Sequence, residues 1–415
     1  MRIAMLTNNY KPFVGGVPIS IERLSNELRN LGHEVYIFAH TYGNDEKDPY
    51  VIRYRSRKKK LKGIITVPHI FDSTIEEKFS TLSFDLIHVH HPMLMGYVAQ
   101  YLKVKYNVPI VFTYHTRYEQ YLHYIRLYEI FQQHSNRVKS RIIRLFEKKI
   151  VCRGMENLVT FHNRVFTNHC DLVFVPSYSM RDFLVEQGTK AEIKVVPTGI
   201  EKDDFECDLN KVRHIRHKYL EGKDYIFCTV SRLEKEKNIL FILEGLKKFK
   251  EAKGNCFRLL IIGDGSQRSE LEKAAEDLGL KENVIFCGKV EHEEIRNFYH
   301  ASDLFLFASQ SETQGIVLLE AMAAGLPVVA VYASGVCDVV EEGVNGYLTE
   351  LDVDTWAERI ERIVSNEDMR RKMKRKSILI AKEYLSHNIA QKVAGYYADL
   401  LLYKGGEQLY EKEII

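Results

Sequence analysis

The chain of 415 residues contains no window of about 18 uninterrupted apolar residues, which argues against a membrane-spanning helix. No signal peptide is expected, because the first residues run straight into a strand-like segment. The seven cysteines are an odd number and lie at least 18 residues apart, so neither a disulfide framework nor a zinc knuckle is predicted. Only nine prolines and 24 glycines are present, which excludes a collagenous or low-complexity chain.

Charge is distributed unevenly between the two halves of the chain. Residues 1–200 carry 28 Lys and Arg against 18 Asp and Glu, whereas residues 201–415 carry 31 against 38. The first half therefore has a net charge of +10 and the second of −7, although the whole chain is at +3. The basic half favours a negatively charged partner, which a membrane, a nucleic acid or a phosphorylated ligand would each provide.

Short apolar runs alternate with amphipathic stretches along the chain, which predicts parallel strands covered by helices. The predicted strands are Ile3–Leu6, Glu34–Phe38, Leu86–Val89, Ile110–Phe112, Leu172–Val175, Ile193–Val196, Tyr225–Val230, Arg258–Ile262, Asn283–Phe286, Leu304–Phe307 and Val328–Val331. Helices are predicted near Pro18 and at Ile239–Lys250, Arg268–Asp277, Glu293–Ala301 and Val317–Ala324.

The alternating pattern is interrupted at a turn signal that begins at Pro197, and it restarts at Tyr225. We therefore predict an α/β fold of two doubly wound domains, residues 1–199 and 200–385. Residues 386–415 contain a long amphipathic stretch and predict a helix that packs back on the first domain. Ligands of such folds bind beyond the carboxyl ends of the strands, so functional residues are expected in loops that follow strands.

The strongest candidate segment spans residues 311–322, which follow the predicted strand Leu304–Phe307 and open into a helix. The free backbone N–H groups and the dipole at a helix start favour a phosphate. Glu312 precedes this helix and Glu320 lies about one and a half turns inside it, so the two carboxylates can reach hydroxyls on either side of a phosphate. An acidic cap and a solvated helix charge would produce the same spacing.

A second candidate segment spans residues 231–238, directly after the predicted strand Tyr225–Val230. It contains Arg232 and Lys237, and two cations on one such loop are well placed to neutralise a diphosphate. The acidic residues Glu234 and Glu236 lie among them, so a solvated run of charges also explains the pattern.

Two glycine turns and one histidine follow other predicted strands. Gly263 follows Arg258–Ile262 and Gly16 follows the first strand, but neither belongs to a GxGxxG fingerprint. His115 follows Ile110–Phe112, where an imidazole can bind and polarise a substrate hydroxyl, although a structural histidine fits the same position.

Two patterns suggest metal ligands without supplying a complete set. Strand alternation places His88 and His90 on one face, but no cysteine or carboxylate nearby completes a site. Asp352 and Asp354 precede a predicted helix, and N-capping explains them better. We expect no metal and no tightly bound cofactor.

The positive charge of the first half is concentrated in two segments. Residues 53–62 include seven basic residues and no acidic one, and residues 117–153 include nine basic and three acidic residues with tyrosines at helical spacing. Aromatic rings with cations suit a membrane interface, whereas a surface helix on its own sheet or single-stranded nucleic acid would also fit. The residues singled out are Lys58, Lys59, Lys60, Tyr121 and Tyr124.

Taken together, these segments resemble the family 4 retaining glycosyltransferases, which have the GT-B architecture of two Rossmann-like domains that face a cleft. The resemblance covers nearly the whole chain. The motifs that carry it are Gly15-Gly16, Ser231-Arg232-Leu233 with Glu236-Lys237-Asn238, Gly263-Asp264-Gly265 and the E-x7-E signature from Glu312 to Glu320.

The resemblance implies a role for each motif. Arg232 and Lys237 would bind the diphosphate of a nucleotide-sugar donor, Glu320 the ribose hydroxyls, and Glu312 the hydroxyls of the donor sugar. His115 would lie beside the transferred sugar, and the second domain would hold the donor while the first holds the acceptor. The remaining donor-site residues that it implies are Gly16, Gly263, Lys289, Val290, Gln314, Gly315, Ile316 and Val317.

A narrower resemblance concerns residues 113–125, which look like the equivalent stretch of bacterial diacylglycerol glucosyltransferases, with Tyr114 where those enzymes commonly have Phe. It implies hexosyl transfer from UDP-glucose to a membrane lipid, without a metal in the cleft and without a nucleic-acid partner. The enzyme would be cytoplasmic and bound peripherally to the inner face of the cell membrane. A soluble family 4 transferase with a small-molecule or polysaccharide acceptor is the alternative. A GT-B epimerase or phosphorylase and a non-catalytic binding module agree less well with the E-x7-E signature.

Overall fold

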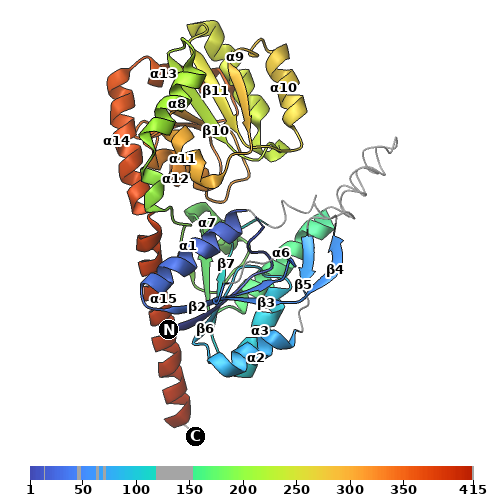
Figure 1. The fold of residues 1–415 in the computed structure, drawn as a ribbon. Coiled ribbons are helices and arrows are strands. Elements are labelled where there is room, and N and C mark those ends of the chain that lie inside the picture. The colour runs from blue at the N-terminus through green and yellow to red at the C-terminus, as the bar shows by residue number, and fades with distance from the viewer. Residues whose placement is uncertain (14, 44–47, 62–64, 69–71, 118–152, 414–415) are drawn as a thin grey trace. The chain divides into compact units, whose positions relative to one another are not determined.

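The computed structural model describes residues 1–413 apart from 14, 44–47, 62–64, 69–71 and 118–152. The chain forms two compact units: unit 1 comprises Met1–Pro197 with Ile389–Ile415, and unit 2 comprises Thr198–Asn388. Each unit has a parallel sheet with helices packed on it (Figure 1). The predicted α/β fold of two doubly wound sheets is confirmed. Among the described helices, none is long and apolar enough to cross a membrane.

Unit 1 is built on a seven-stranded parallel sheet of order β3-β2-β1-β6-β7-β8-β9. Its strands are β1 (Arg2–Leu6), β2 (Glu34–His40), β3 (Val51–Tyr54), β6 (Leu86–Val89), β7 (Ile110–Thr113), β8 (Leu172–Val175) and β9 (Ile193–Val195). A separate antiparallel pair consists of β4 (Ser56–Leu61) and β5 (Ile65–Pro68). Successive side chains of β1 enter different hydrophobic clusters, as the two-residue period of a strand buried on both faces requires.

The helices of unit 1 cover both faces of this sheet. They are α1 (Gly16–Asn30), α2 (Ser73–Leu82), α3 (Met95–Tyr106), α6 (Arg153–Asn168), α7 (Tyr178–Glu186) and α15 (Ser386–Glu413). Helices α2, α3, α6 and α7 share one cluster, and α1 and α15 share the other. Tyr397 of α15 is fully buried and stacks on Phe174 of β8 with a centroid distance of 6.0 Å. The C-terminal helix therefore packs on the sheet of unit 1, as predicted.

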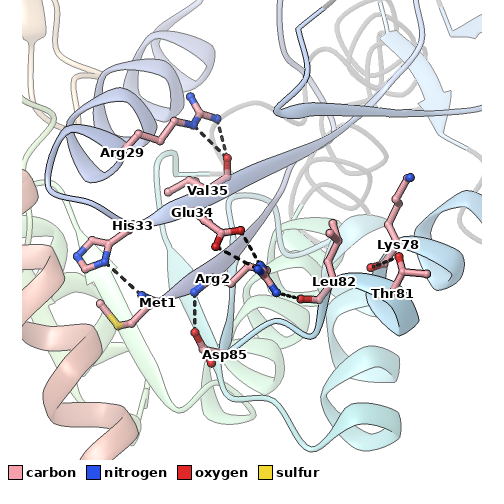
Figure 2. Close-up of polar contacts among 10 residues, drawn as sticks. All are labelled: Met1, Arg2, Arg29, His33, Glu34, Val35, Lys78, Thr81, Leu82 and Asp85. Atoms are coloured by element: carbon pink, nitrogen blue, oxygen red, sulfur yellow. Dashed lines mark hydrogen bonds and ion pairs between the residues drawn. The ribbon is translucent and has the colours of Figure 1, made fainter.

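Arg2 fixes the amino ends of β1 and β2 (Figure 2). Its Nε donates to Glu34 Oε2 at 2.8 Å, its guanidinium donates to the Leu82 carbonyl at the end of α2, and its backbone N–H donates to Asp85 Oδ2 at 2.6 Å. These groups lie at the opposite end of the strands from the loops where ligands bind, so we assign them a structural role.

Unit 2 has a six-stranded parallel sheet of order β12-β11-β10-β13-β14-β15. Its strands are β10 (Tyr225–Val230), β11 (Phe257–Ile262), β12 (Val284–Gly288), β13 (Leu304–Phe307), β14 (Val328–Val331) and β15 (Gly346–Thr349). Its helices are α8 (Leu209–Leu220), α9 (Ile239–Lys253), α10 (Arg268–Asp277), α11 (His292–His300), α12 (Ile316–Ala323), α13 (Val353–Val364) and α14 (Glu367–Glu383), with 3-10 turns η3 (Lys202–Phe205) and η4 (Lys235–Lys237). Helices α9 and α13 approach so closely that a Cβ on Gly245 would lie 2.3 Å from the Trp356 ring.

Candidate functional site

Loops that follow three neighbouring strands of unit 2 meet at one edge of its sheet. Strand β10 lies between β11 and β13, and the three strands run parallel, so their carboxyl ends share an edge. Residues 231–238 follow β10, residues 263–267 follow β11, and residues 308–315 follow β13. The structure thus brings both charged candidate motifs and the Gly263 turn to one place, called here the carboxyl edge of unit 2.

Lys237 and Glu312 join two of these loops through an ion pair between Lys237 Nζ and Glu312 Oε1. Their side chains are only 17% and 18% exposed, so the pair is well shielded from solvent. Lys237 ends the 3-10 turn η4, and Ser309 Oγ donates to the carbonyl oxygen of Glu236 in that turn at 3.2 Å. The loops after β10 and β13 are therefore connected by two side-chain contacts.

Arg232 lies at the rim of the same edge. Its side chain is 59% exposed, with one guanidinium nitrogen 3.2 Å from Glu236 Oε1. The next residue, Leu233, is fully buried, and its N–H donates to the Asp264 carbonyl at 3.0 Å. Gly263 has φ of +131°, and a Cβ there would lie 1.9 Å from the Ser231 carbonyl oxygen. A glycine at 263 therefore lets the two loops pack together beneath Arg232.

Helix α12 begins at this edge with Gly315 as its N-cap, in the left-handed region at φ 75° and ψ 61°. The first amides of a helix have no acceptor within the helix, and the helix dipole makes this end positive. The first turn, which includes Ile316 and Val317, contains no acidic residue to offset that potential. This helix start can hold the oxygens of a phosphate group.

Glu320 lies in the second turn of α12 and is only 5% exposed. His292 Nε2, at the start of α11, lies 4.0 Å from Glu320 Oε1. Tyr299 is buried nearby, and burial together with the Glu320 carboxylate raises the pKa of its phenol well above the ordinary value. Sequence reasoning missed His292 and Tyr299, because neither belongs to a motif and both come from a different helix.

Gln314 uses its side chain within unit 2 rather than at the helix start. Its Oε1 accepts from the Thr198 N–H at 2.7 Å and its Nε2 donates to the Thr198 carbonyl at 2.8 Å. The sequence prediction concerned the backbone around Gln314 and did not indicate the hydrogen bonds between its side chain and Thr198. Lys289 and Val290 follow β12, beyond β11 in the same sheet; Lys289 is exposed and Val290 packs against the hydrophobic core.

Two candidates of unit 1 lie at the carboxyl ends of its strands. Gly16 opens helix α1, and a Cβ added there would meet no atom of the described residues within 4 Å. The described packing of unit 1 therefore does not require glycine at this position. His115 follows β7 and belongs to a cluster of histidines.

His88 and His90 of this cluster are buried, and His115 beside them is partly exposed. His90 Nδ1 lies 2.9 Å from His115 Nε2, and His88 bonds Thr113 Oγ1 at 2.6 Å and the Tyr397 hydroxyl at 2.7 Å. Burial lowers the pKa of His88 to about 3 and holds the pKa values of His90 and His115 well below the ordinary value. Neutral imidazoles can orient and hydrogen-bond a hydroxyl near His115.

The two metal-like patterns have structural partners. His88 and His90 do share a face, with ring centroids 4.2 Å apart, but His88 is bonded on both ring nitrogens. Asp352 caps α13 by accepting from the Thr355 N–H at 2.8 Å, and Asp354 pairs with a lysine. Within the described part of the chain there is no group of three or more His, Cys, Asp or Glu that could hold a metal ion.

The basic and aromatic residues singled out in the first half are only partly covered by the structure. Lys58, Lys59 and Lys60 lie on strand β4, of which the backbone is described. Tyr121 and Tyr124 lie outside the described residues.

Comparison with known proteins identifies the family. Residues 14–204 match the family model "Glycosyltransferase Family 4", and residues 211–379 match "Glycosyl transferases group 1". The chain belongs to the family 4 glycosyltransferases of GT-B fold. This assignment confirms the resemblance carried by the E-x7-E signature and makes the carboxyl edge of unit 2 part of an enzyme.

Relatives match this glycosyltransferase over nearly its whole length. The alpha-monoglucosyldiacylglycerol synthase of Streptococcus pneumoniae is 29% identical over 97% of this chain and 86% of its own, and that of Acholeplasma laidlawii is 27% identical over 97% and 98%. Among solved structures, Anabaena HepE in complex with UDP has a TM-score of 0.72 at 18% identity, covering 96% of this chain and 100% of its own. Sucrose-phosphate synthase from Thermosynechococcus elongatus has a TM-score of 0.74 at 19% identity, covering 97% and 99%.

Proposed function

We propose that this glycosyltransferase moves a hexose, glucose from UDP-glucose, to a membrane lipid of the diacylglycerol class with retention of configuration. The observation that carries the donor half of the proposal is the carboxyl edge of unit 2. There, the Lys237–Glu312 pair and the start of α12 place a cation, a carboxylate and free helix amides together. The names of the two full-length relatives support the lipid acceptor.

The donor would be held by this edge through its diphosphate and its ribose. Arg232 and Lys237 supply positive charge, and the amides at the start of α12 supply hydrogen bonds to phosphate oxygens. Glu320 accepts hydrogen bonds from the ribose hydroxyls, and Lys289 with Val290 lies beside the base. For unit 1, the family resemblance supports two further roles, contact of Gly16 with the diphosphate and of His115 with the transferred sugar.

Transfer breaks the bond between the sugar C1 and the phosphate oxygen, so negative charge develops on the departing diphosphate. Positive groups fixed before the reaction stabilise that charge most effectively, because they need no reorganisation. Lys237 is fixed by Glu312, and Glu312 in turn can accept hydrogen bonds from the donor sugar and position it. We assign Glu312 this positioning role.

Membrane association is part of the proposal, and two neighbouring helices of unit 1 support it. Helix α3 exposes Tyr97, Tyr101 and Val104, and α6 exposes Leu158 and Phe161. The two helices touch through the Tyr97 hydroxyl, which is 2.6 Å from a ring nitrogen of His162 on α6. Large apolar side chains gathered on adjacent helices are typical of surfaces that meet a membrane or another protein. We place the enzyme on the cytoplasmic face of an anionic membrane.

A donor screen tests the proposed reaction. The protein is incubated with vesicles that contain diacylglycerol and with a panel of nucleotide sugars, and release of the nucleotide is measured. We expect release from UDP-glucose that depends on diacylglycerol. Release that requires a water-soluble acceptor and ignores the vesicles would favour the soluble transferase instead.

A further inference from the structure

Gln314 lies between Glu312 and Gly315 in the loop after β13, yet its side chain turns to a distant segment of the same unit. It is 4% exposed and forms hydrogen bonds with both backbone groups of Thr198, at 2.7 and 2.8 Å. The side-chain amide thus accepts from the N–H and donates to the carbonyl of one residue, as a neighbouring antiparallel strand would. Both backbone hydrogen-bonding groups of Thr198 are therefore held by Gln314.

Thr198 is the first residue of unit 2, directly after Pro197 at the end of the main segment of unit 1. We call residues 197–200 the linker. The same linker is bound to the other point where the chain passes between units: Ile200 N–H donates to the Tyr384 carbonyl at 2.8 Å, and Ser386 N–H donates to the Ile200 carbonyl at 2.9 Å. The two passages of the chain are therefore hydrogen-bonded to each other within unit 2.

Packing leaves this junction little freedom. A Cβ on Gly199 would lie 2.5 Å from the Ser386 Cα, and Ser386 Oγ donates to the carbonyl of Ile200 at 3.1 Å and to Glu201 Oε1 at 3.0 Å. On the other side, a Cβ on Gly335 would lie 2.5 Å from the Thr313 carbonyl. A movement of the loop around Gln314 must therefore be taken up by the linker or break the two hydrogen bonds.

We propose that Gln314 is a positioning residue that couples the loop of Glu312 to the linker, so that nucleotide binding at the carboxyl edge of unit 2 changes the conformation of residues 197–200. The coupling goes beyond the proposed function and requires of it only that a nucleotide bind at this edge. The same loop contains the partner of Lys237, so a ligand that draws Lys237 toward its phosphates also changes the loop. Packed elements tend to have discrete arrangements, which lets a small shift at one site move another.

Hydrogen exchange with UDP as the probe tests the coupling. In the wild type, UDP should slow amide exchange in the loop 309–317 and also in residues 197–201. In Gln314→Ala, UDP should still bind and protect the loop, because the Ser309 and Lys237 connections remain, but protection of residues 197–201 should be lost. Transfer should fall about ten- to a hundredfold in kcat, with the donor KM changed less than about threefold, because misplacement acts at the reacting geometry.

Two further variants separate coupling from loss of folding. Ser386→Ala removes side-chain bonds of the same junction but leaves Gln314 in place, so UDP-dependent protection of residues 197–201 should persist. Gln314→Glu keeps the shape and one acceptor, and its kcat relative to wild type should rise as the pH is lowered, because a protonated carboxyl can again donate to the Thr198 carbonyl.

Three results would overturn the coupling while leaving the proposed donor in place. The first is UDP binding to the wild type without any effect on residues 197–201. The second is an unchanged kcat and unchanged protection in Gln314→Ala. The third is a Gln314→Glu variant whose relative kcat does not respond to pH. Failure of UDP to bind the wild type at all would overturn both this coupling and the proposed donor.

Discussion

Lys237 and Glu312 form an ion pair between loops that are 75 residues apart in sequence and adjacent at the carboxyl edge of unit 2. Each side chain is more than four-fifths shielded from solvent. The pair holds a cation and a carboxylate at the start of α12, where an anionic ligand is favoured. A donor diphosphate would share Lys237 with Glu312, while the sugar hydroxyls would bind Glu312.

Replacement of Lys237 by alanine should lower kcat strongly, because it removes a fixed charge that stabilises the leaving diphosphate. By analogy with the loss of one oxyanion-hole donor, the cost is about 2–4 kcal/mol of transition-state stabilisation. Arg232→Ala should act in the same direction. Steady-state kinetics checks both, with Lys235→Ala as the matched control, since Lys235 is an exposed lysine of the same turn. A wild-type kcat in Lys237→Ala would contradict the diphosphate assignment.

The two glutamates of the signature should have separable effects. Glu320→Ala should mainly raise the donor KM, because contacts with the ribose are the same in the ground state and the transition state. Glu312→Ala should mainly lower kcat, because it positions the sugar at the bond that breaks. Measurement of kcat and KM for both variants tests this division, and equal effects on KM alone would refute it.

Chelation of metal ions should leave the activity nearly unchanged. The proposed stabilisation of the diphosphate comes from Arg232, Lys237 and the start of α12. The check is the transfer rate before and after dialysis against EDTA. A complete loss that divalent cations restore would show that a metal takes over part of this role.

The exposed apolar residues of α3 and α6 should contribute to vesicle binding. Leu158→Ser and Phe161→Ser should weaken sedimentation with anionic vesicles. Leu379→Ser in unit 2 should not, although Leu379 is about as exposed as Phe161. Replacement of Lys58, Lys59 and Lys60 by Glu should weaken binding to anionic vesicles by about 1 kcal/mol per charge near the surface, and this effect should decrease as salt is added. If the wild-type protein fails to bind anionic vesicles at low salt, the proposed membrane association is wrong.

The free energy of unfolding should decline as the pH falls below the ordinary pKa of a histidine side chain. Burial lowers the pKa of His88 to about 3 and of His91 to about 4, so in this range the unfolded chain binds protons that the folded chain does not. The free energy of unfolding then falls by on the order of 1 kcal/mol per histidine per pH unit between the unfolded and folded pKa values, and it is flat above them. Denaturant unfolding of the wild type and His91→Asn checks this: the variant should have the shallower dependence, and equal slopes would argue against it.

The parts of the fold that could be predicted are those with a local pattern. Strand β13 consists of four buried apolar residues, Leu304–Phe307, and was identifiable from its hydrophobicity alone. Strand β15 was missed, because it begins at Gly346, whose backbone packs against Val328 so closely that a Cβ would lie 2.2 Å from the Val328 carbonyl oxygen. Strand β3 was missed because it is only four residues long and includes Arg53, so it gives no clear apolar run.

The site shows the same limit. Arg232, Lys237 and Glu312 were expected together because parallel strands deliver their loops to one edge. No comparable rule predicts which single side chains form hydrogen bonds between residues far apart in sequence. Gln314 and Thr198 are 116 residues apart, and His88 and Tyr397 are 309 apart, so no sequence spacing could indicate either hydrogen bond.

The fate of the sugar tests the account most directly. Purified protein is incubated with UDP-glucose labelled in the glucose and with vesicles containing diacylglycerol, and the label is followed after extraction into organic solvent. We predict that it enters the lipid fraction as a glucosylated diacylglycerol in the wild type and that Lys237→Ala greatly slows this transfer. Label that stays in the aqueous phase while UDP is released to a soluble acceptor would contradict the central claim.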